Sequence, residues 1–254
     1  MNSKTTDFLF PEWPAPDNVK SVITLRFPGS SQMPYDGFNL ADHVGDNPAD
    51  VLANRQQLTK SLGLCNQPAW LHQVHGTQVI YAPEVSSNVS ADASYTDQVG
   101  EACVVLTADC LPVLLCNQGG TKVAAAHAGW RGLCDGIVRN TVACFSSHET
   151  VLAYLGPAIG PEVYEVGTDV VEAFISSAQN NHHKALIEAA FIPSKSSSYM
   201  ADLYALARAE LIACGVEQIY GGGSCTYSQS EQFFSYRRDQ VTGRNATLIW
   251  LERS

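Results

Sequence analysis

Positively charged residues are scarce in this sequence. Lys and Arg total 15 against 25 Asp and Glu, which leaves a formal net charge of -10 at pH 7. Nucleic-acid binding depends on clustered Lys and Arg that neutralise phosphates, so no nucleic-acid partner is expected. The composition favours a small-molecule ligand instead.

Long hydrophobic stretches are also missing. No run approaches the ~20 apolar residues of a membrane-spanning helix, and the N-terminal residues contain no apolar segment of signal-peptide length. We therefore expect a cytoplasmic protein with no membrane partner. Thiols stay reduced in the cytoplasm, so the eight cysteines are expected to be free, most of them as small core residues.

Two metal-binding patterns are absent as well. The eight cysteines include no Cys-x-x-Cys pair, which excludes a structural zinc ribbon. The seven histidines include no His-x-His pair, so the chain lacks the ligands for a cluster of several copper ions. A site for a single metal ion remains compatible with these two absences.

The order of apolar runs and turn residues predicts the fold class. Strands are predicted at residues 21–27, 69–71, 78–81, 102–106, 113–116, 122–126, 151–155 and 246–251, with another leading into 220–223. Helices are predicted at 47–63, 135–145, 168–178 and 202–214. Strands and helices intermix with short connections, so we predict an α+β fold with a mixed β-sheet core flanked by helices. Without a linker or repeat, we expect one catalytic domain over 1–254, with 1–18 as a peripheral N-terminal segment.

Three residues with metal-binding side chains stand where a hydrophobic stretch breaks into a turn marked by Gly or Pro. They are His75, Cys110 and His127. At such breaks a scaffold presents side chains to a pocket. Two imidazoles and a thiolate suit zinc or copper, and three protein ligands leave a tetrahedral ion one open position, as in catalytic sites.

Each of these residues also has a simpler interpretation, because such histidines are commonly hydrogen-bonding residues and such cysteines commonly belong to the core. Cys110 and His127 would also suit the nucleophile and base of a metal-free cysteine hydrolase. His75 favours the metal, because a Cys–His dyad would need a carboxamide or carboxylate in its place. His72 competes for the same position, and we prefer His75 because Gly76 lets the backbone turn closely around an ion.

Six motifs follow one another between about Arg26 and Leu251: HQVHG, TADCLPVLL, AAAHAGWRG, LGPAIG, CTYS and FFSYRRDQVTGR. Together they resemble the YfiH/laccase-domain family, once labelled multicopper polyphenol oxidase and now regarded as purine nucleoside phosphorylases. The resemblance implies the metal ligands His75, Cys110 and His127. One departure is Gln240, which stands where a glycine is usual.

The resemblance also implies an activity. It points to a metal-dependent purine nucleoside phosphorylase that converts adenosine, inosine, guanosine and methylthioadenosine to free base and ribose 1-phosphate, with adenosine deaminase as a side activity. Zinc is the expected cofactor and copper the alternative, in a monomer or homodimer that binds nucleoside and phosphate. The alternatives are the Cys110/His127 hydrolase and a single-copper polyphenol oxidase. A metal-carrying or partner-binding module ranks last, because only His182-His183 hints at a His-rich tract.

Other polar residues, in these motifs and before them in the chain, are candidates for substrate contacts. Asp109 is either a turn-forming residue or an acid–base group beside the metal. Arg131 either binds phosphate or anchors its loop. Asn39 could contact substrate, and Gln73 could orient substrate or a metal ligand. The weaker candidates for the phosphate contact are Arg26, Arg237 and Arg238.

Overall fold

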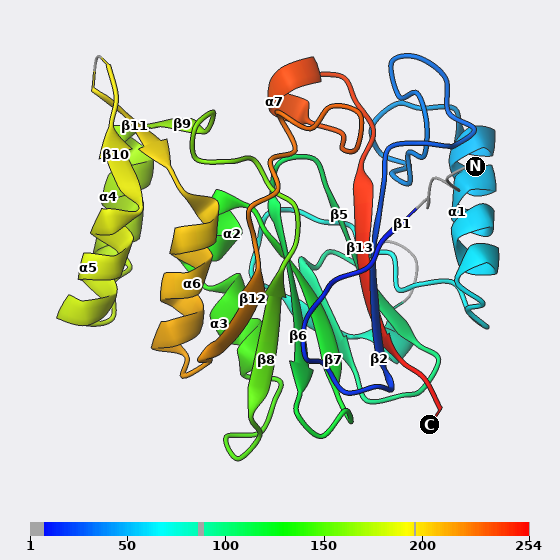
Figure 1. The fold of residues 1–254 in the computed structure, drawn as a ribbon, viewed down its shortest axis with the longest axis horizontal. Helices are drawn as coiled ribbons and strands as arrows, with labels where there is room; N and C mark the ends of the chain where they lie inside the picture. Colours follow the sequence, from blue (N-terminus) through cyan, green and yellow to red (C-terminus); the bar gives the residue numbers. More distant parts are fainter. Residues whose placement is uncertain (1–7, 86–88, 196, 254) are drawn as a thin grey trace, which may run out of the picture.

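The structure, a computed structural model, describes residues 8–85, 89–195 and 197–253. Its elements stack as helices, a six-stranded sheet, a four-stranded sheet and helix α1, in that order (Figure 1). The predicted single α+β domain with a mixed sheet is confirmed, although two large sheets share the core. No helix within the described ranges is long and apolar enough to cross a membrane.

The six-stranded sheet has the order β12-β8-β6-β7-β4-β3. Its strands are β12 (Gln218–Gly221), β8 (Val151–Leu155), β6 (Leu111–Asn117), β7 (Val123–Ala128), β4 (Ala93–Thr96) and β3 (Val79–Tyr81). The pairs β12–β8 and β4–β3 are parallel and the other neighbours are antiparallel. The sheet is therefore mixed.

Two further sheets are antiparallel. The four-stranded sheet has the order β1-β2-β13-β5, with β1 (Phe8–Leu9), β2 (Val19–Thr24), β13 (Asn245–Leu251) and β5 (Ala102–Thr107). A small outlying sheet consists of β10 (Phe191–Pro193), β11 (Ser198–Ala201) and β9 (Glu165–Gly167). The helices are α1 (Pro48–Ser61), α2 (Trp130–Asp135), α3 (Ile137–Val142), α4 (Thr168–Ser176), α5 (Asn181–Ala189), α6 (Leu203–Ala213) and α7 (Tyr236–Asp239), with a 3-10 turn η1 (Ala82–Glu84).

Alternating side chains on β7 separate the two faces of the six-stranded sheet. Ala126 and Ala128 belong to the core on the helical side, whereas Val123 and Ala125 belong to the core between the two large sheets. His127 has the parity of Val123 and Ala125. The strand therefore directs His127 toward the four-stranded sheet, at the end of β7.

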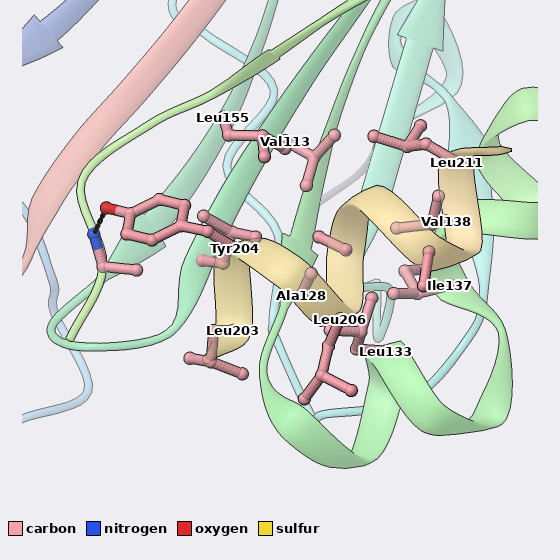
Figure 2. Close-up of a cluster of buried hydrophobic side chains, with 14 of the residues drawn as sticks. Val113, Ala128, Leu133, Ile137, Val138, Leu155, Leu203, Tyr204, Leu206 and Leu211 are labelled. Atoms are coloured by element: carbon pink, nitrogen blue, oxygen red, sulfur yellow. Dashed lines mark hydrogen bonds between the residues drawn. The ribbon is translucent and has the colours of Figure 1, made fainter. Parts of the chain in front are cut away.

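Figure 2 shows the core on the helical side, where α2, α3 and α6 pack against the sheet. Leu133, Ile137 and Leu206 are almost fully buried there, and each such side chain contributes about 1.5–3 kcal/mol of transfer free energy. The Tyr204 hydroxyl accepts a hydrogen bond from the Ala158 N–H at 2.9 Å. This core fixes α2, which begins just after His127, against the sheet.

Several predicted elements differ from the observed ones. The helix predicted at 135–145 begins earlier and is divided into α2 and α3 at Gly136, whose φ of 104° is one that glycine adopts readily. The strand predicted at 69–71 is absent, and Ala69 forms only an isolated bridge to Cys103. Elements β1, β4, β9, β10, β11, α5 and α7 were not predicted; all but α5 are too short to show a clear hydrophobic period.

Gln240 adopts the backbone conformation φ 61°, ψ −59°, which is strained for any residue except glycine. The Val241 N–H donates to the Asp239 carbonyl at 2.7 Å and closes this three-residue turn. We expect Gln240→Gly to raise the free energy of unfolding by about 1 kcal/mol, because relief of strain exceeds the added entropy of the unfolded chain. Urea denaturation measures this change, and a lower stability of the variant would contradict it.

A buried carboxyl group lies among three helices behind the sheet. Glu210 on α6 has its Oε1 atom 3.2 Å from His183 Nε2 and its Oε2 atom 3.7 Å from Arg139 Nη2. The Cys134 and Cys214 thiols also face this carboxyl group. Burial raises the pKa of Glu210 from 4.5 to about 7, and the Arg139 charge only partly offsets this rise.

The raised pKa of Glu210 predicts a pH-dependent stability. The protonated carboxyl group stabilises the fold at low pH, and this contribution is lost as the pH rises from 4.5 through about 7. Relative to the unaltered protein, Glu210→Gln should therefore gain on the order of 2 kcal/mol in unfolding free energy between about pH 5 and about pH 8. Urea denaturation across this range measures the difference. The exposed Glu188→Gln is the control, and a pH-independent difference for Glu210→Gln would contradict the prediction.

Candidate metal centre

The loop that carries His75 is fixed by one buried carboxylate. Asp92 accepts hydrogen bonds from the backbone N–H groups of Val74, His75 and Gly76 at 3.2, 2.9 and 2.7 Å. These bonds hold His75 at a φ of 59°, a left-handed conformation that is uncommon outside glycine. The strained residue is thus the predicted ligand itself, and Gly76 follows it as part of the Asp92-bound turn.

Cys110 lies where the chain crosses from β5 in the four-stranded sheet to β6 in the six-stranded sheet. Asp109 makes this crossing possible with a φ of 88°. Its carboxylate accepts hydrogen bonds from the Thr226 hydroxyl and from the Arg237 backbone N–H, both at 2.6 Å. Because both oxygens are occupied, these contacts favour a turn-forming role for Asp109 over an acid–base role.

His127 is nearly fully buried near the end of β7. Its Nδ1 atom lies 2.8 Å from Asp92 Oδ1. Since an ionised carboxylate can only accept, the Nδ1–H group donates to Asp92, and Nε2 is the nitrogen that can bind a metal ion once its own proton is displaced. Asp92 therefore orients two predicted ligands, one through backbone N–H groups and the other through its ring.

The structure brings the three predicted ligands together. One ligand atom each from His75, Cys110 and His127 lies within 4.8 Å of the other two. The two imidazole rings meet edge to face, with centroids 4.7 Å apart. Gly129 packs directly against this cluster and leaves no space for a side chain, because a Cβ atom there would lie 2.6 Å from His75 Nδ1 and 3.1 Å from Cys110 Sγ.

Charges around the three side chains support cation binding. Burial alone would lower the pKa of His127, but the Cys110 thiol and the Asp92 carboxylate outweigh it and raise the pKa to about 9. Burial, with the nearby charge of His127, lowers the pKa of His75. For Asp92, burial favours a higher pKa, yet the bonds from His127 and the Gly76 N–H lower it overall. The ionised carboxylate of Asp92 therefore lies beside the two imidazoles and favours a bound cation.

The donor set fits a divalent metal ion. Imidazole nitrogens and thiolate sulfur are both ligands that zinc takes, three protein ligands leave an open position, and the contact of His127 with Asp92 is the carboxylate–histidine pairing common at zinc sites. Among the described residues this is the one such group of three or more metal-binding side chains. The described part of the chain thus offers a site for one ion and not for a multicopper centre.

Comparison with known proteins shows the family to which the chain belongs. The family model described as "Multi-copper polyphenol oxidoreductase laccase" matches residues 20–252. The chain belongs to this laccase-domain (YfiH) family. Membership rests on nearly the whole sequence and confirms the resemblance seen in the six motifs.

Relatives in the YfiH family carry a different activity in their names. The Escherichia coli protein named "Purine nucleoside phosphorylase YfiH" is 51% identical over 245 residues, 96% of this chain and 98% of that protein. A Haemophilus influenzae "Purine nucleoside phosphorylase" is 47% identical over 245 residues, covering 95% and 98% of the two chains. The crystal structure of Neisseria meningitidis protein NMB0706 matches with a TM-score of 0.91 and 47% identity over 98% of this chain and all of that one.

The structure gives most of the other predicted site residues a bracing role. Asn39 is fully buried; its amide bonds Ala41, Asp46 and the Arg244 N–H, which leaves no free hydrogen-bonding position for substrate. The Gln73 amide makes two bonds, of 2.7 and 2.8 Å, to the backbone of Leu106 at the end of β5. Gln73 therefore ties the His75 loop to the strand that leads to Cys110.

The predicted arginines differ in whether a carboxylate among the described residues pairs with them. Arg26 donates to Asp36 at 2.9 Å and packs against Phe234, so its charge is neutralised. Arg131 is exposed and stacks on Trp130, with 4.7 Å from its Cζ to the ring centroid. Arg131 contributes to the lowered pKa of His75, after burial and His127, so it lies near the metal ligands.

Three residues of the site were not predicted from the sequence. Asp92 falls between the strands predicted at 78–81 and 102–106, and only its position between two alanines hints at burial. Gly129 belongs to the motif HAGWRG, but its contact with two ligands requires the fold. Arg244 ends the motif FFSYRRDQVTGR, in which only the two preceding arginines were considered. Burial lowers the pKa of Arg244, and the Cys110 charge acts on its guanidinium.

A cavity of about 500 Å³ adjoins the site, although its walls do not include the three ligands. Its lining includes His72, from the same loop as His75, and His43. Burial and then the charge of Arg244 lower the pKa of His43, which places the cavity on the Arg244 side. Trp70, with Arg55 stacked 4.2 Å from its ring, forms another wall. The volume is in the range of small-molecule sites.

Proposed function

We propose that this protein is a metal-dependent purine nucleoside phosphorylase. The observation that carries the proposal is the cluster of His75, Cys110 and His127 ligand atoms, beside which the cationic Arg131 and Arg244 lie. A metal-binding group and free guanidinium groups suit a reaction between a nucleoside and an anion. The names of the relatives specify that anion as phosphate and the nucleoside as a purine nucleoside.

The substrates and the ion are narrower parts of this proposal. Adenosine and inosine, and with them guanosine and methylthioadenosine, would be cleaved to free base and ribose 1-phosphate. His75, Cys110 and His127 would hold zinc, with copper as the alternative. When bound, the ion supplies a Lewis acid beside the substrate.

The chain's own residues supply binding and orientation. In phosphorolysis a phosphate oxygen bonds to the ribose C1′ while the C1′–N9 bond breaks, and the purine leaves with the electron pair and takes up a proton. Positive charge develops on the sugar, so the phosphate must already lie against C1′. Arg131 is the arginine that the sequence indicates for holding it. Asp92 keeps His127 in one tautomer, and the cavity beside His72 has room for the nucleoside.

Adenosine deamination is the proposed side activity. Water would add at C6 of the purine and ammonia would leave, so this reaction needs no phosphate. It would use the same cluster of side chains. Release of ammonia from adenosine in phosphate-free buffer tests it, and the absence of ammonia would remove this activity from the proposal.

One contact favours a second candidate function, a cysteine hydrolase. Asp92, His127 and Cys110 form a carboxylate–imidazole–thiol series, as in nucleophilic triads, and Asp92 supplies the orienting group that the sequence did not reveal. His75 has no part in such a triad. Its strained loop and its ligand atom within 4.8 Å of the others fit metal binding instead.

A single experiment separates these functions. The purified protein is incubated with inosine with and without phosphate, before and after chelation, and the chelated sample is then resupplied with zinc. A phosphorylase yields hypoxanthine and ribose 1-phosphate only with phosphate, loses activity on chelation and regains it with zinc. Activity that survives chelation and is abolished by alkylation of Cys110 would contradict the metal-dependent proposal and support the hydrolase.

A further inference from the structure

Arg244 lies at the end of the sheet that leads to Cys110. β13 pairs antiparallel with β5, and Asn245 is opposite Thr107. Arg244 therefore immediately precedes β13 at the level where β5 runs into the crossing that carries Cys110. Burial lowers the pKa of Arg244 and its interaction with Cys110 partly offsets this, while burial first and Arg244 among the nearby cations lower the pKa of His75, so Arg244 lies near both residues.

The guanidinium of Arg244 is held in place by its own loop. Its Nη1 donates to the carbonyls of Thr242 at 2.9 Å and Gly243 at 3.0 Å, and its backbone N–H donates to Asn39 Oδ1 at 2.9 Å. The backbone of this loop is tightly packed, because a Cβ atom at Gly243 would lie 2.8 Å from Asn39 Cβ and from Phe234 Cζ. A cation fixed in this way is preorganised for a ligand.

This cation has no carboxylate partner among the residues that the structure describes. Four other arginines do have one: Arg26 with Asp36, Arg55 with Asp42, Arg139 with Glu210 and Arg238 with Asp239. Within the same described ranges, Nε and Nη2 of Arg244 also make no hydrogen bond. The group is half-buried, and that burial lowers its pKa. A partly desolvated guanidinium with two free donor positions suits a tetrahedral oxyanion.

We propose that Arg244 is the principal contact for inorganic phosphate, and this inference rests on the phosphorylase function proposed above. Phosphate bound there would lie beside the metal ligands and next to the cavity proposed for the nucleoside. Arg131 is exposed and stacked on Trp130, with no hydrogen bond to the described residues, so it contributes at the rim. Asn39 then acts on the reaction by positioning Arg244.

The test compares three arginine variants that are checked for unaltered metal content and thermal stability. Isothermal titration measures the affinity for inorganic phosphate alone, and steady-state kinetics give the separate KM values for phosphate and inosine. Arg244→Gln should weaken phosphate binding about 10- to 100-fold and leave the KM for inosine within about 3-fold. Arg131→Gln should have a smaller effect. Arg208→Gln is the control, because that guanidinium also bonds two carbonyls, of Ile219 and Gly221, away from the site.

Arg244→Lys covers the case in which the glutamine variant does not fold. Lysine keeps the positive charge but lacks the planar guanidinium that can donate two parallel hydrogen bonds, so an intermediate loss of phosphate affinity is expected. Unchanged phosphate affinity in Arg244→Gln or Arg244→Lys would overturn the inference, as would a parent protein that binds no phosphate. Phosphate binding that depends on Arg244 without formation of ribose 1-phosphate would support the anion site and contradict the phosphorylase function.

Discussion

Replacing Cys110 with alanine should leave the purified protein without tightly bound metal and without phosphorolysis. Cys110 supplies the one thiolate of the three proposed ligands, whose ligand atoms lie within 4.8 Å of one another. Loss of an outer partner alone lowers metal affinity by about 10- to 100-fold, so loss of a ligand should lower it by more than about 100-fold. Elemental analysis of the purified protein and the rate of ribose 1-phosphate formation measure the two effects.

Cys65→Ala is the matched control for Cys110→Ala, because Cys65 is exposed and lies outside the cluster. It should keep both metal and activity. His75→Ala and His127→Ala should behave like Cys110→Ala. A Cys110→Ala protein that retains one equivalent of metal would contradict the assignment of this cysteine as a ligand.

Gly129→Ala should also abolish metal binding, although it alters no ligand. The added Cβ would lie 2.6 Å from His75 Nδ1 and 3.1 Å from Cys110 Sγ, so these two atoms must move apart. The backbone at Gly129, with φ −65° and ψ 157°, suits alanine, and the fold should therefore survive. We expect metal affinity to fall by at least about 100-fold while the unfolding free energy of the metal-free chain changes by less than about 1 kcal/mol.

Competition with a chromophoric zinc chelator measures the affinity of the Gly129→Ala protein. Gly119→Ala provides the control, since the nearest atom to a Cβ there is 3.9 Å away. Unchanged zinc affinity in Gly129→Ala would show that the two ligand atoms do not act together on one ion.

The grouping of His75, Cys110 and His127 was predictable because each occupies a local break that the sequence marks with Gly or Pro. The choice of His75 over His72 also agrees with the structure, where His75 joins the cluster and His72 lines the neighbouring cavity. The sequence suggested that Gly76 would allow the backbone to turn at this point. In the structure His75 itself takes the strained φ. That strain is maintained by Asp92, a contact across 17 residues that no local pattern shows.

Long-range pairing explains the remaining differences. The apolar runs that became β5 and β6 gave no sign that they belong to different sheets, because the Asp109 turn separating them resembles a hairpin in sequence. Asn39 and Gln73 are polar residues whose sequence positions suggested substrate contacts, yet their amides bond backbone groups far away in the chain. Arg244 gains its place only through the register of β13 against β5.

The most direct measurement follows the oxygen atoms of phosphate through the reaction. The metal-loaded protein is incubated with inosine and phosphate labelled with heavy oxygen, and the sugar product is analysed by mass spectrometry. Phosphorolysis predicts ribose 1-phosphate that retains every labelled oxygen, including the one bonded to C1′, and predicts no such product from the Cys110→Ala protein. Free ribose with an unlabelled oxygen from water, formed equally by both proteins, would contradict a metal-dependent phosphorylase at His75, Cys110 and His127.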